Sequence, residues 1–193
     1  MRGNNTIQYF IFTPNQERVI RVLPCDKDVL YNAAIKDLND RGVTEDDLVD
    51  LVIFLQSKYY PHLTREDFAK PVGKVLKKRE VQNAIITGVQ LDRLAEQGAL
   101  QSPLQEIVAN DEGLYGIDEI MAFSIVNVYG SIGFTNYGYI DKVKPGILQE
   151  LNNKRSGHVH TFLDDIVGAI AAAASASLAH SCVSASVDDA ADD

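Results

Sequence analysis

Two adjacent carboxylates, Asp164 and Asp165, open a long run of small and apolar residues. A helix of this composition is expected to be buried, and an unpartnered carboxylate inside it would cost several kcal/mol. The pair therefore needs a cation, a basic partner or strong hydrogen-bond donors. The alternative is a solvated first turn, where negative charge stabilises a helix by about 0.3–1 kcal/mol. In that case Thr161 would be the N-cap.

Two further acidic segments upstream lie in apolar or glycine-rich surroundings. One contains Asp118 and Glu119, and the other contains Asp141, three residues before Lys144. Three such segments within one helical bundle could converge on a hard divalent cation. Such a cation takes carboxylate oxygens as ligands and keeps water molecules that a phosphate can displace.

The composition is that of an ordinary globular domain. The chain has 193 residues, 46% of them hydrophobic and 23% charged, which is enough to bury a core within one domain. The net charge of −9 argues against nucleic acid as a partner, because a phosphate polyanion would be repelled. Four acidic residues fall within residues 187–193, and we expect a flexible acidic tail over residues 181–193.

Cysteine usage and hydropathy indicate a cytoplasmic protein. Cys25 and Cys182 are far apart and lack metal-ligand spacing, so both are expected to be free thiols in a reducing compartment. No secretory signal is recognisable, and no apolar stretch reaches the roughly 18 residues that a membrane span requires.

The hydrophobic periodicity predicts an all-α fold, a multihelical bundle over residues 24–180. Gly42 is expected to end the first helix in the left-handed conformation, and Thr44 and Thr64 to cap the next two. The later helices are expected over residues 72–97 with a kink at Gly88, 103–110, 112–129 as the central helix, 147–154, and from about 161 onward. Glycine spacing predicts a loop over residues 130–138. Two short β-favouring runs in residues 1–23 predict an N-terminal hairpin.

A row of lysines and a pair of histidines each allow a functional and a purely structural interpretation. Lys70, Lys74, Lys77 and Lys78 would form one stripe if a helix continues through Pro71. The stripe would be either a docking face for anionic lipid or a solvated helix face. His158 and His160 could orient a phosphate or act as an acid. Alternatively, they are ordinary loop histidines. The alanines after Asp165 fit a core or a contact between copies.

At three places the sequence resembles the phosphatidylglycerophosphatase A family, and most closely its soluble YutG-like branch. The likeness covers about Lys27 to His180 and is carried by an acid-acid motif, an Asp-x-x-Lys-Pro motif and an Asp-Asp motif before small residues. These are Gly116-Ile-Asp118-Glu119-Ile120, Ile140-Asp141-Lys-Val-Lys144-Pro145 and Phe162-Leu-Asp164-Asp165-Ile-Val-Gly168-Ala169. The chain departs from membrane-bound members at Gly138, where they carry Arg, and in the order Gly168-Ala169.

The resemblance implies an all-α, Mg²⁺-dependent phosphatase that converts phosphatidylglycerophosphate to phosphatidylglycerol, with Mn²⁺ as a substitute metal. Its site would contain metal ligands, catalytic groups and substrate contacts. The metal ligands are Asp118, Asp141, Asp164 and Asp165; the catalytic residues are Glu119, Asp165 and Lys144; and the substrate contacts are Lys144 and His160.

The expected partners are a phospholipid phosphate substrate and a second copy of the chain, with no nucleic acid. A peripheral contact with the inner face of the membrane would bring the cytoplasmic enzyme to this substrate. Two alternatives stay open. One is a Mg²⁺-dependent phosphohydrolase of a soluble phosphate ester, and the other is a non-enzymatic helical oligomerisation module whose acids cap helices.

Overall fold

The computed structural model describes residues 27–153 and 157–188, and side chains as far as residue 181. Throughout this part of the chain the regular elements are helices, so the predicted all-α fold is confirmed. They are α1 (Lys27–Asp40), α2 (Glu45–Gln56), α3 (Arg65–Leu76), α4 (Arg79–Glu96), α5 (Leu104–Asn110), α6 (Ile117–Val126), the 3-10 helix η1 (Asn127–Tyr129), α7 (Gly130–Val143), α8 (Ile147–Leu151) and α9 (Leu163–Asp188).

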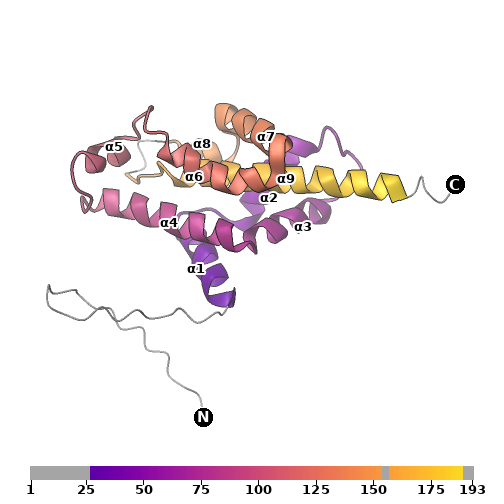
Figure 1. The fold of residues 1–193 in the computed structure, drawn as a ribbon, viewed down its shortest axis with the longest axis horizontal. Helices are drawn as coiled ribbons and strands as arrows, with labels where there is room; N and C mark the ends of the chain where they lie inside the picture. The colour runs from indigo at the N-terminus through magenta and orange to yellow at the C-terminus, as the bar shows by residue number, and fades with distance from the viewer. Residues whose placement is uncertain (1–26, 154–156, 189–193) are drawn as a thin grey trace, which may run out of the picture.

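Helix α9 is the centre of the molecule. It runs the length of the bundle, with α6 and α7 on one side and α3 and α4 on another (Figure 1). Its side chains from Ile166 to Ala176 are buried, as the apolar run after Asp165 predicted. Most of them are alanines, and small side chains let the surrounding helices approach closely without leaving gaps in a densely packed interior.

Helix α4 packs tightly against the start of α9 at Gly88. A Cβ atom added to Gly88 would overlap Ile166 Cδ1 and would lie 3.0 Å from the Cβ of Phe162. The helix expected around Gly88 is present, because α4 continues through this residue, and the kink expected there stays a prediction. The lack of a side chain at Gly88 permits the close crossing of α4 and the segment that starts α9. The real break in the expected helix 72–97 comes at Lys77 and Lys78, between α3 and α4.

The predicted helix ends are confirmed where they depend on local chemistry. Thr44 and Asp47 form a reciprocal capping box at the start of α2, and Thr64 and Asp67 form the same box at α3. Gly42, after the end of α1, has a φ of +79°, which favours glycine.

Two expectations about the middle of the chain were wrong. Residues 130–138 are not a loop but the first part of α7. Gly133 faces its neighbours there: a Cβ atom would lie 3.0 Å from Val126 Cγ1 and 3.2 Å from Val126 O, so the glycine permits close packing within a helix. The helix expected over 112–129 is shorter, and α9 rather than α6 is central. Ile117 and Ile120 on α6 are exposed.

The predicted lysine stripe does not exist as a single helix face. Although α3 does contain Pro71, it ends at Leu76, so Lys77 and Lys78 follow the helix rather than continue its face. Lys70 binds Asp67 at 2.8 Å, and the Lys78 ammonium lies over the ring of Tyr129.

The predicted N-terminal hairpin and C-terminal tail lie wholly or partly outside the residues that the structure describes. The hairpin of residues 1–23 and the side chains of Cys25 and Cys182 are outside it. The backbone of α9 continues to Asp188, past the expected start of the tail at residue 181. Of the described helices, none combines the length and the apolar character needed to cross a bilayer.

Candidate metal centre and adjoining pocket

Carboxylates from α6 and α9 meet at the packed junction of these helices. One oxygen each from Asp118, Glu119 and Asp165 lie within 4.8 Å of one another. Asp118 and Asp165 are only 6% and 7% exposed. Oxygen ligands at this spacing match the preference of a hard divalent cation such as Mg²⁺.

The first turns of both helices position these acids. Gly116, with a φ of +70°, precedes α6 and starts the helix so that Asp118 and Glu119 fall in its first turn. The Asp118 carboxylate accepts a hydrogen bond of 3.0 Å from the backbone N–H of Glu119. In the same way the Asp164 carboxylate accepts one of 2.9 Å from the backbone N–H of Asp165. Negative charge is favourable at both helix N-termini.

Burial shifts the ionisation of Asp118 and Asp165, the two least exposed acids of this cluster. It raises the pKa of Asp118 to about 7, with a further contribution from the hydrogen bond to Glu119. It also raises the pKa of Asp165 to about 8, helped by the negative charge of Asp164. A bound cation would reverse this balance, because it stabilises the charged form of its ligands.

Lys144 supplies the positive charge beside the acids. Its ammonium lies 2.7 Å from Asp141, 2.8 Å from Asp164 and 3.8 Å from Asp165. Burial lowers the pKa of Lys144, but the charges of Asp164 and Asp141 outweigh this effect and raise it overall. Lys144 therefore stays charged at neutral pH. It forms ion pairs with Asp141 of α7 and Asp164 of α9.

The residues of the cluster fit a Mg²⁺ or Mn²⁺ ion. Glu119 Oε2 is buried and accepts no hydrogen bond from any residue that the structure describes. A buried carboxylate oxygen without a donor is costly, and a cation between Glu119, Asp118 and Asp165 would satisfy it. The donor set consists only of carboxylate oxygens, which favours Mg²⁺ or Mn²⁺ over softer metals.

Tyr137 adds a buried hydroxyl from α7. Burial raises the pKa of Tyr137, and the negative charges of Asp165 and Asp141 raise it further. The hydroxyl therefore keeps its proton. Its ring contacts the position of Gly168, where an added Cβ would lie 3.7 Å from Tyr137 Cε2.

The start of α9 is capped by Asp92 on α4, which the sequence reasoning missed. The Asp92 carboxylate, 0% exposed, accepts hydrogen bonds of 3.1 Å from the backbone N–H groups of Phe162 and Leu163. Thr161, the expected N-cap, instead donates its hydroxyl to Val108 O at 2.7 Å. The capping expectation was therefore wrong. The sequence signal that could have identified Asp92 is an acidic side chain between the apolar positions Val89 and Ala95 of α4.

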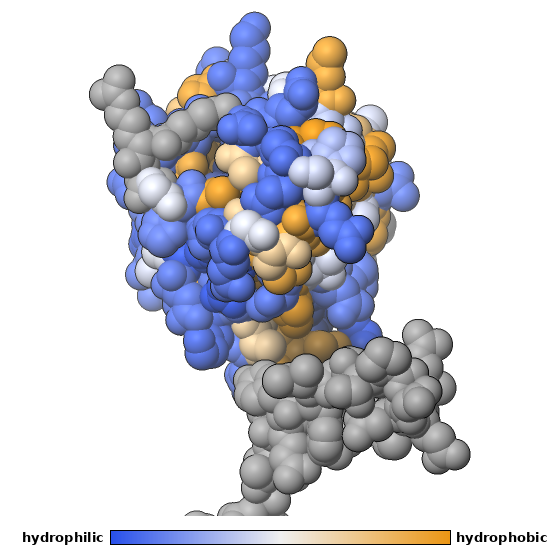
Figure 2. Space-filling view, turned by 90° about the vertical axis from the view of Figure 1, so that its left-hand side faces the viewer, coloured by the Kyte–Doolittle hydropathy of each residue, from blue (hydrophilic) through white to orange (hydrophobic). Residues whose placement is uncertain are grey.

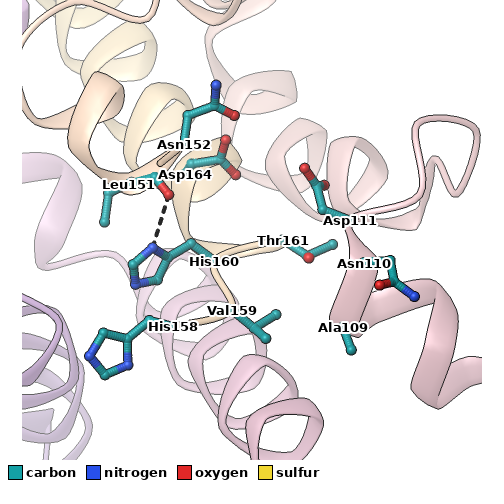
Figure 3. Close-up of a pocket in the computed structure, with 10 residues that line it drawn as sticks. All are labelled: Ala109, Asn110, Asp111, Leu151, Asn152, His158, Val159, His160, Thr161 and Asp164. Carbon is teal, nitrogen blue, oxygen red and sulfur yellow. Dashed lines mark hydrogen bonds between the residues drawn. The ribbon is translucent and has the colours of Figure 1, made fainter. Parts of the chain in front are cut away.

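A polar pocket of about 230 Å³ adjoins the acid cluster through Asp164. It lies between the end of α5, the end of α8 and the segment that leads into α9 (Figure 3). Its lining residues are Ala109, Asn110, Asp111, Leu151, Asn152, His158, Val159, His160, Thr161 and Asp164. Figure 2 views the molecule from the end that carries α5, where most of the visible surface is hydrophilic.

The segment before α9 is held by a second polar network. Glu96 accepts hydrogen bonds from the side chain of Arg41 and, at 2.9 Å, from the backbone N–H of Val159. His158 Nδ1 lies 3.2 Å from the same carboxylate, and the rings of His158 and His160 stack. Sequence reasoning did not identify Arg41 or Glu96, because their partners are far away in the chain.

The structure divides the expected site residues into three groups. Asp118, Glu119 and Asp165 form the ligand cluster. Asp141 and Asp164, expected as metal ligands, bind Lys144. His160 lines the adjoining pocket, together with Asp164.

Several known proteins are similar to this chain in sequence, and solved structures are similar to it in fold. The chain is 64% identical over 143 residues to YutG of Bacillus subtilis (strain 168), a protein named as uncharacterized, which covers 74% of this chain and 86% of YutG. The crystal structure of the low temperature requirement C protein from Listeria monocytogenes is 62% identical, with a TM-score of 0.79, over 81% of this chain and 98% of that one. A protein of unknown function from Bacillus stearothermophilus is 66% identical, with a TM-score of 0.77, over 78% and 94% of the two chains.

A family-level comparison covers the same part of the molecule. The sequence model described as phosphatidylglycerophosphatase A matches residues 42–180, which include every residue of the acid cluster and Lys144. The chain therefore belongs to the phosphatidylglycerophosphatase A family.

Proposed function

We propose that this protein is a metal-dependent phosphatase that removes the terminal phosphate of phosphatidylglycerophosphate and releases phosphatidylglycerol. The observation that carries the proposal is the meeting of Asp118, Glu119 and Asp165 within 4.8 Å, next to a charged Lys144. Family membership supports the same reaction class.

Asp118, Glu119 and Asp165 would hold a Mg²⁺ or Mn²⁺ ion. When bound, such an ion offsets phosphate charge, polarises the phosphorus centre and lowers the pKa of a coordinated water. Without a cation, the acidic cluster would repel a phosphomonoester.

Side chains of the site would bind the phosphate and activate the attacking water. Lys144 stays protonated and offers its ammonium to a phosphate oxygen, while Asp141 and Asp164 hold the ammonium in place. With Oε2 of Glu119 facing the cation, the other carboxylate oxygen of Glu119 can orient the attacking water and accept its proton. The water oxygen forms the new bond to phosphorus, the ester bond breaks, and the departing alcohol oxygen takes up a proton from the surrounding water.

The test is phosphate release from phosphatidylglycerophosphate in mixed micelles, with and without EDTA. We expect EDTA to abolish release and added Mg²⁺ or Mn²⁺ to restore it. A panel of soluble phosphate esters, run in parallel, should be hydrolysed more slowly than the lipid.

Each other result rejects a defined part of the proposal. Release that resists EDTA rejects the metal centre, and faster hydrolysis of a soluble ester rejects the lipid as the substrate. No release from any ester, together with no thermal shift on adding Mg²⁺ or Mn²⁺, would mean that the acids only cap helices.

A further inference from the structure

We infer that the outer face of α6 and α7 docks on the surface of an anionic phospholipid bilayer and holds the acid cluster at the level of the lipid headgroups. This inference rests on the proposed function, because it concerns how a phosphatidylglycerophosphate molecule within a membrane reaches the cluster. It names a partner surface that neither the acid cluster nor the adjoining pocket supplies.

Exposed hydrophobic side chains are concentrated around these two helices. Of the thirteen large hydrophobic side chains that are exposed in the described part of the chain, eight lie between residues 114 and 143. These eight form the apolar face, which consists of Leu114, Ile117, Ile120, Val128, Ile132, Phe134, Tyr139 and Val143. Leu114 is 94% exposed and Ile120 is 60% exposed. Single exposed apolar side chains need no explanation, but a group of them marks a surface for another molecule or a membrane.

Helical spacing turns these side chains outward. Ile117 and Ile120 are three positions apart on α6, and Ile132, Tyr139 and Val143 follow one another at intervals of seven and four positions on α7. Such intervals place side chains on one side of a helix. The two helices cover the same side of α9 (Figure 1), and an edge-to-face ring contact with a centroid distance of 5.3 Å joins them. The outward rows of α6 and α7 therefore belong to one surface.

The surface continues onto the end of α2. The rings of Phe54 and Tyr139 stack with a centroid distance of 6.1 Å and an interplanar angle of 8°. Nearby, a groove of about 360 Å³ lies between α2 and α7, and exposed Tyr59 and Ile132 are among its lining residues. None of the described residues that line this groove is charged. Tyrosine is enriched where proteins meet the membrane–water boundary, because its ring is apolar and its hydroxyl is polar.

The charges of this segment are arranged for contact with an anionic surface. Residues 120–140 contain no charged side chain, although 23% of the whole chain is charged. Within residues 113–143, all of which the structure describes, the acids are Asp118, Glu119 and Asp141, which belong to the cluster, and Lys142 is exposed. The outward charge of this segment is thus positive, although the whole chain has a net charge of −9.

A lysine lies at each end of the apolar face. Lys142 precedes Val143, and the Lys78 ammonium lies 5.7 Å from the centroid of the Tyr129 ring, which follows Val128. The long apolar stem of lysine lets its charge reach lipid headgroups, and anionic lipids attract that charge. Lysine is instead depleted from the buried centre of interfaces between proteins. The arrangement therefore favours an anionic bilayer over a second copy of the chain.

The acid cluster and the apolar face share α6 and α7. The side chain of Asp141 is 40% exposed, whereas Asp118 is almost buried, so the cluster is more open to its surroundings at Asp141. The neighbours Tyr139 and Val143 belong to the apolar face. A bilayer resting on this face would therefore bring headgroup phosphates to the open side of the cluster, where Lys144 binds Asp141.

Co-sedimentation with vesicles tests the docking face. The full chain is mixed, with Mg²⁺ present, with vesicles of phosphatidylethanolamine and phosphatidylglycerol in equal parts, and its dissociation constant is measured. The double variant Ile120→Ser with Ile132→Ser removes one exposed apolar side chain from each helix. We expect its dissociation constant to rise about 10-fold or more, because less apolar surface leaves water on docking. Both side chains are exposed, so the far-ultraviolet circular dichroism should match that of the wild type.

Val29→Ser with Leu94→Ser is the matched control. Val29 on α1 and Leu94 on α4 are also exposed, but they lie outside the apolar face, so the control should bind vesicles as the wild type does. No binding by the wild type, equal binding by the α6–α7 variant, or an equal loss in the control overturns the inference. A wild-type dimer that the α6–α7 variant dissociates, with vesicle binding unchanged, would show that the face joins two copies and also overturns it.

The charge argument has a test of its own. Lys142→Gln should weaken binding to the anionic vesicles about fivefold and leave binding to vesicles of phosphatidylcholine alone unchanged, because only the anionic surface attracts the ammonium. An equal effect on both kinds of vesicle, or an effect on neither, would overturn the anionic bilayer as the partner.

Turnover separates a failure of docking from a failure of the proposed function. Phosphate release is measured on phosphatidylglycerophosphate in vesicles and on a short-chain form that dissolves as single molecules. In the α6–α7 variant the ratio of the first rate to the second should fall about 10-fold. An unchanged ratio, with release from vesicles intact, overturns docking and leaves the proposed function in place. Docking by the wild type without release from either substrate refutes the proposed function and leaves the docking face in place.

Discussion

The carboxylate of Asp92 lies 3.1 Å from the backbone nitrogen of Leu163, the first residue of α9. A second bond of 3.1 Å to the nitrogen of Phe162 completes the cap. The C-terminal part of α4 thereby fixes where α9 begins, and with it the positions of Asp164 and Asp165.

This buried cap makes stability depend on pH. Burial raises the pKa of Asp92 from 3.8 to about 7, against the opposing effects of its two backbone hydrogen bonds and of Arg41. The folded protein therefore binds a proton more tightly than the unfolded chain, and stability falls as pH rises between these two values. Such a shift corresponds to about 4 kcal/mol.

Asp92→Asn isolates this effect. Urea unfolding followed by circular dichroism should show that the wild type loses stability relative to the variant as the pH is raised through the window from 3.8 to about 7. Other buried acids titrate in both proteins and cancel in the difference. A stability difference that stays constant across this window would contradict the assignment.

Metal affinity should rise with pH. The pKa of Asp118 is about 7 and that of Asp165 about 8, so both carboxyls must lose protons before they bind a cation. We expect the apparent Mg²⁺ affinity from thermal-shift titrations to increase between pH 6 and pH 9, approximately, with proton release on binding. An affinity independent of pH would indicate ligands other than these two.

Asp165→Asn should abolish turnover and leave the fold intact. The amide keeps the shape of the side chain but loses the charge that binds a cation, and we expect phosphate release to fall by roughly 100-fold or more. Far-ultraviolet circular dichroism should show the wild-type helical signal. Asp50→Asn, which changes an exposed partner of Arg65, is the control and should retain activity. Wild-type activity in Asp165→Asn would remove this residue from the site.

Two glycines inside helices should respond to alanine in opposite ways. Gly88→Ala should lower the free energy of unfolding by about 1–3 kcal/mol, because the new methyl group collides with Ile166 and Phe162. Gly73→Ala on α3 meets nothing within 4 Å and should stabilise the protein by up to about 1 kcal/mol, since alanine favours a helix. The same sign for both in chemical denaturation would contradict the packing argument.

The sequence predicted correctly those helix starts that are fixed by contacts between residues close together in the chain. Thr44 and Thr64 form their caps with residues three positions away, so both helix starts were readable. Glycine was ambiguous, because the same residue type permits a left-handed turn at Gly42 and close helix packing at Gly133. Only the tertiary neighbour, here Val126, decides between the two.

The acidic segments of the site were visible in the sequence, but their pairing was not. Apolar surroundings marked Asp118 and Asp165 as acids that need partners, and they lie together. Which acids face Lys144, and that Asp92 caps a helix 71 residues away at Leu163, depend on how α4, α7 and α9 pack. The pocket could not be foreseen for the same reason, because its lining comes from three separate segments.

Helix α9 carries the acid pair in its first turn and the buried alanines of the core in the turns that follow. The candidate metal site and the hydrophobic interior thus occupy two stretches of one continuous helix. A partly melted protein cannot keep one and lose the other, so thermal inactivation and loss of tertiary structure should follow a single curve.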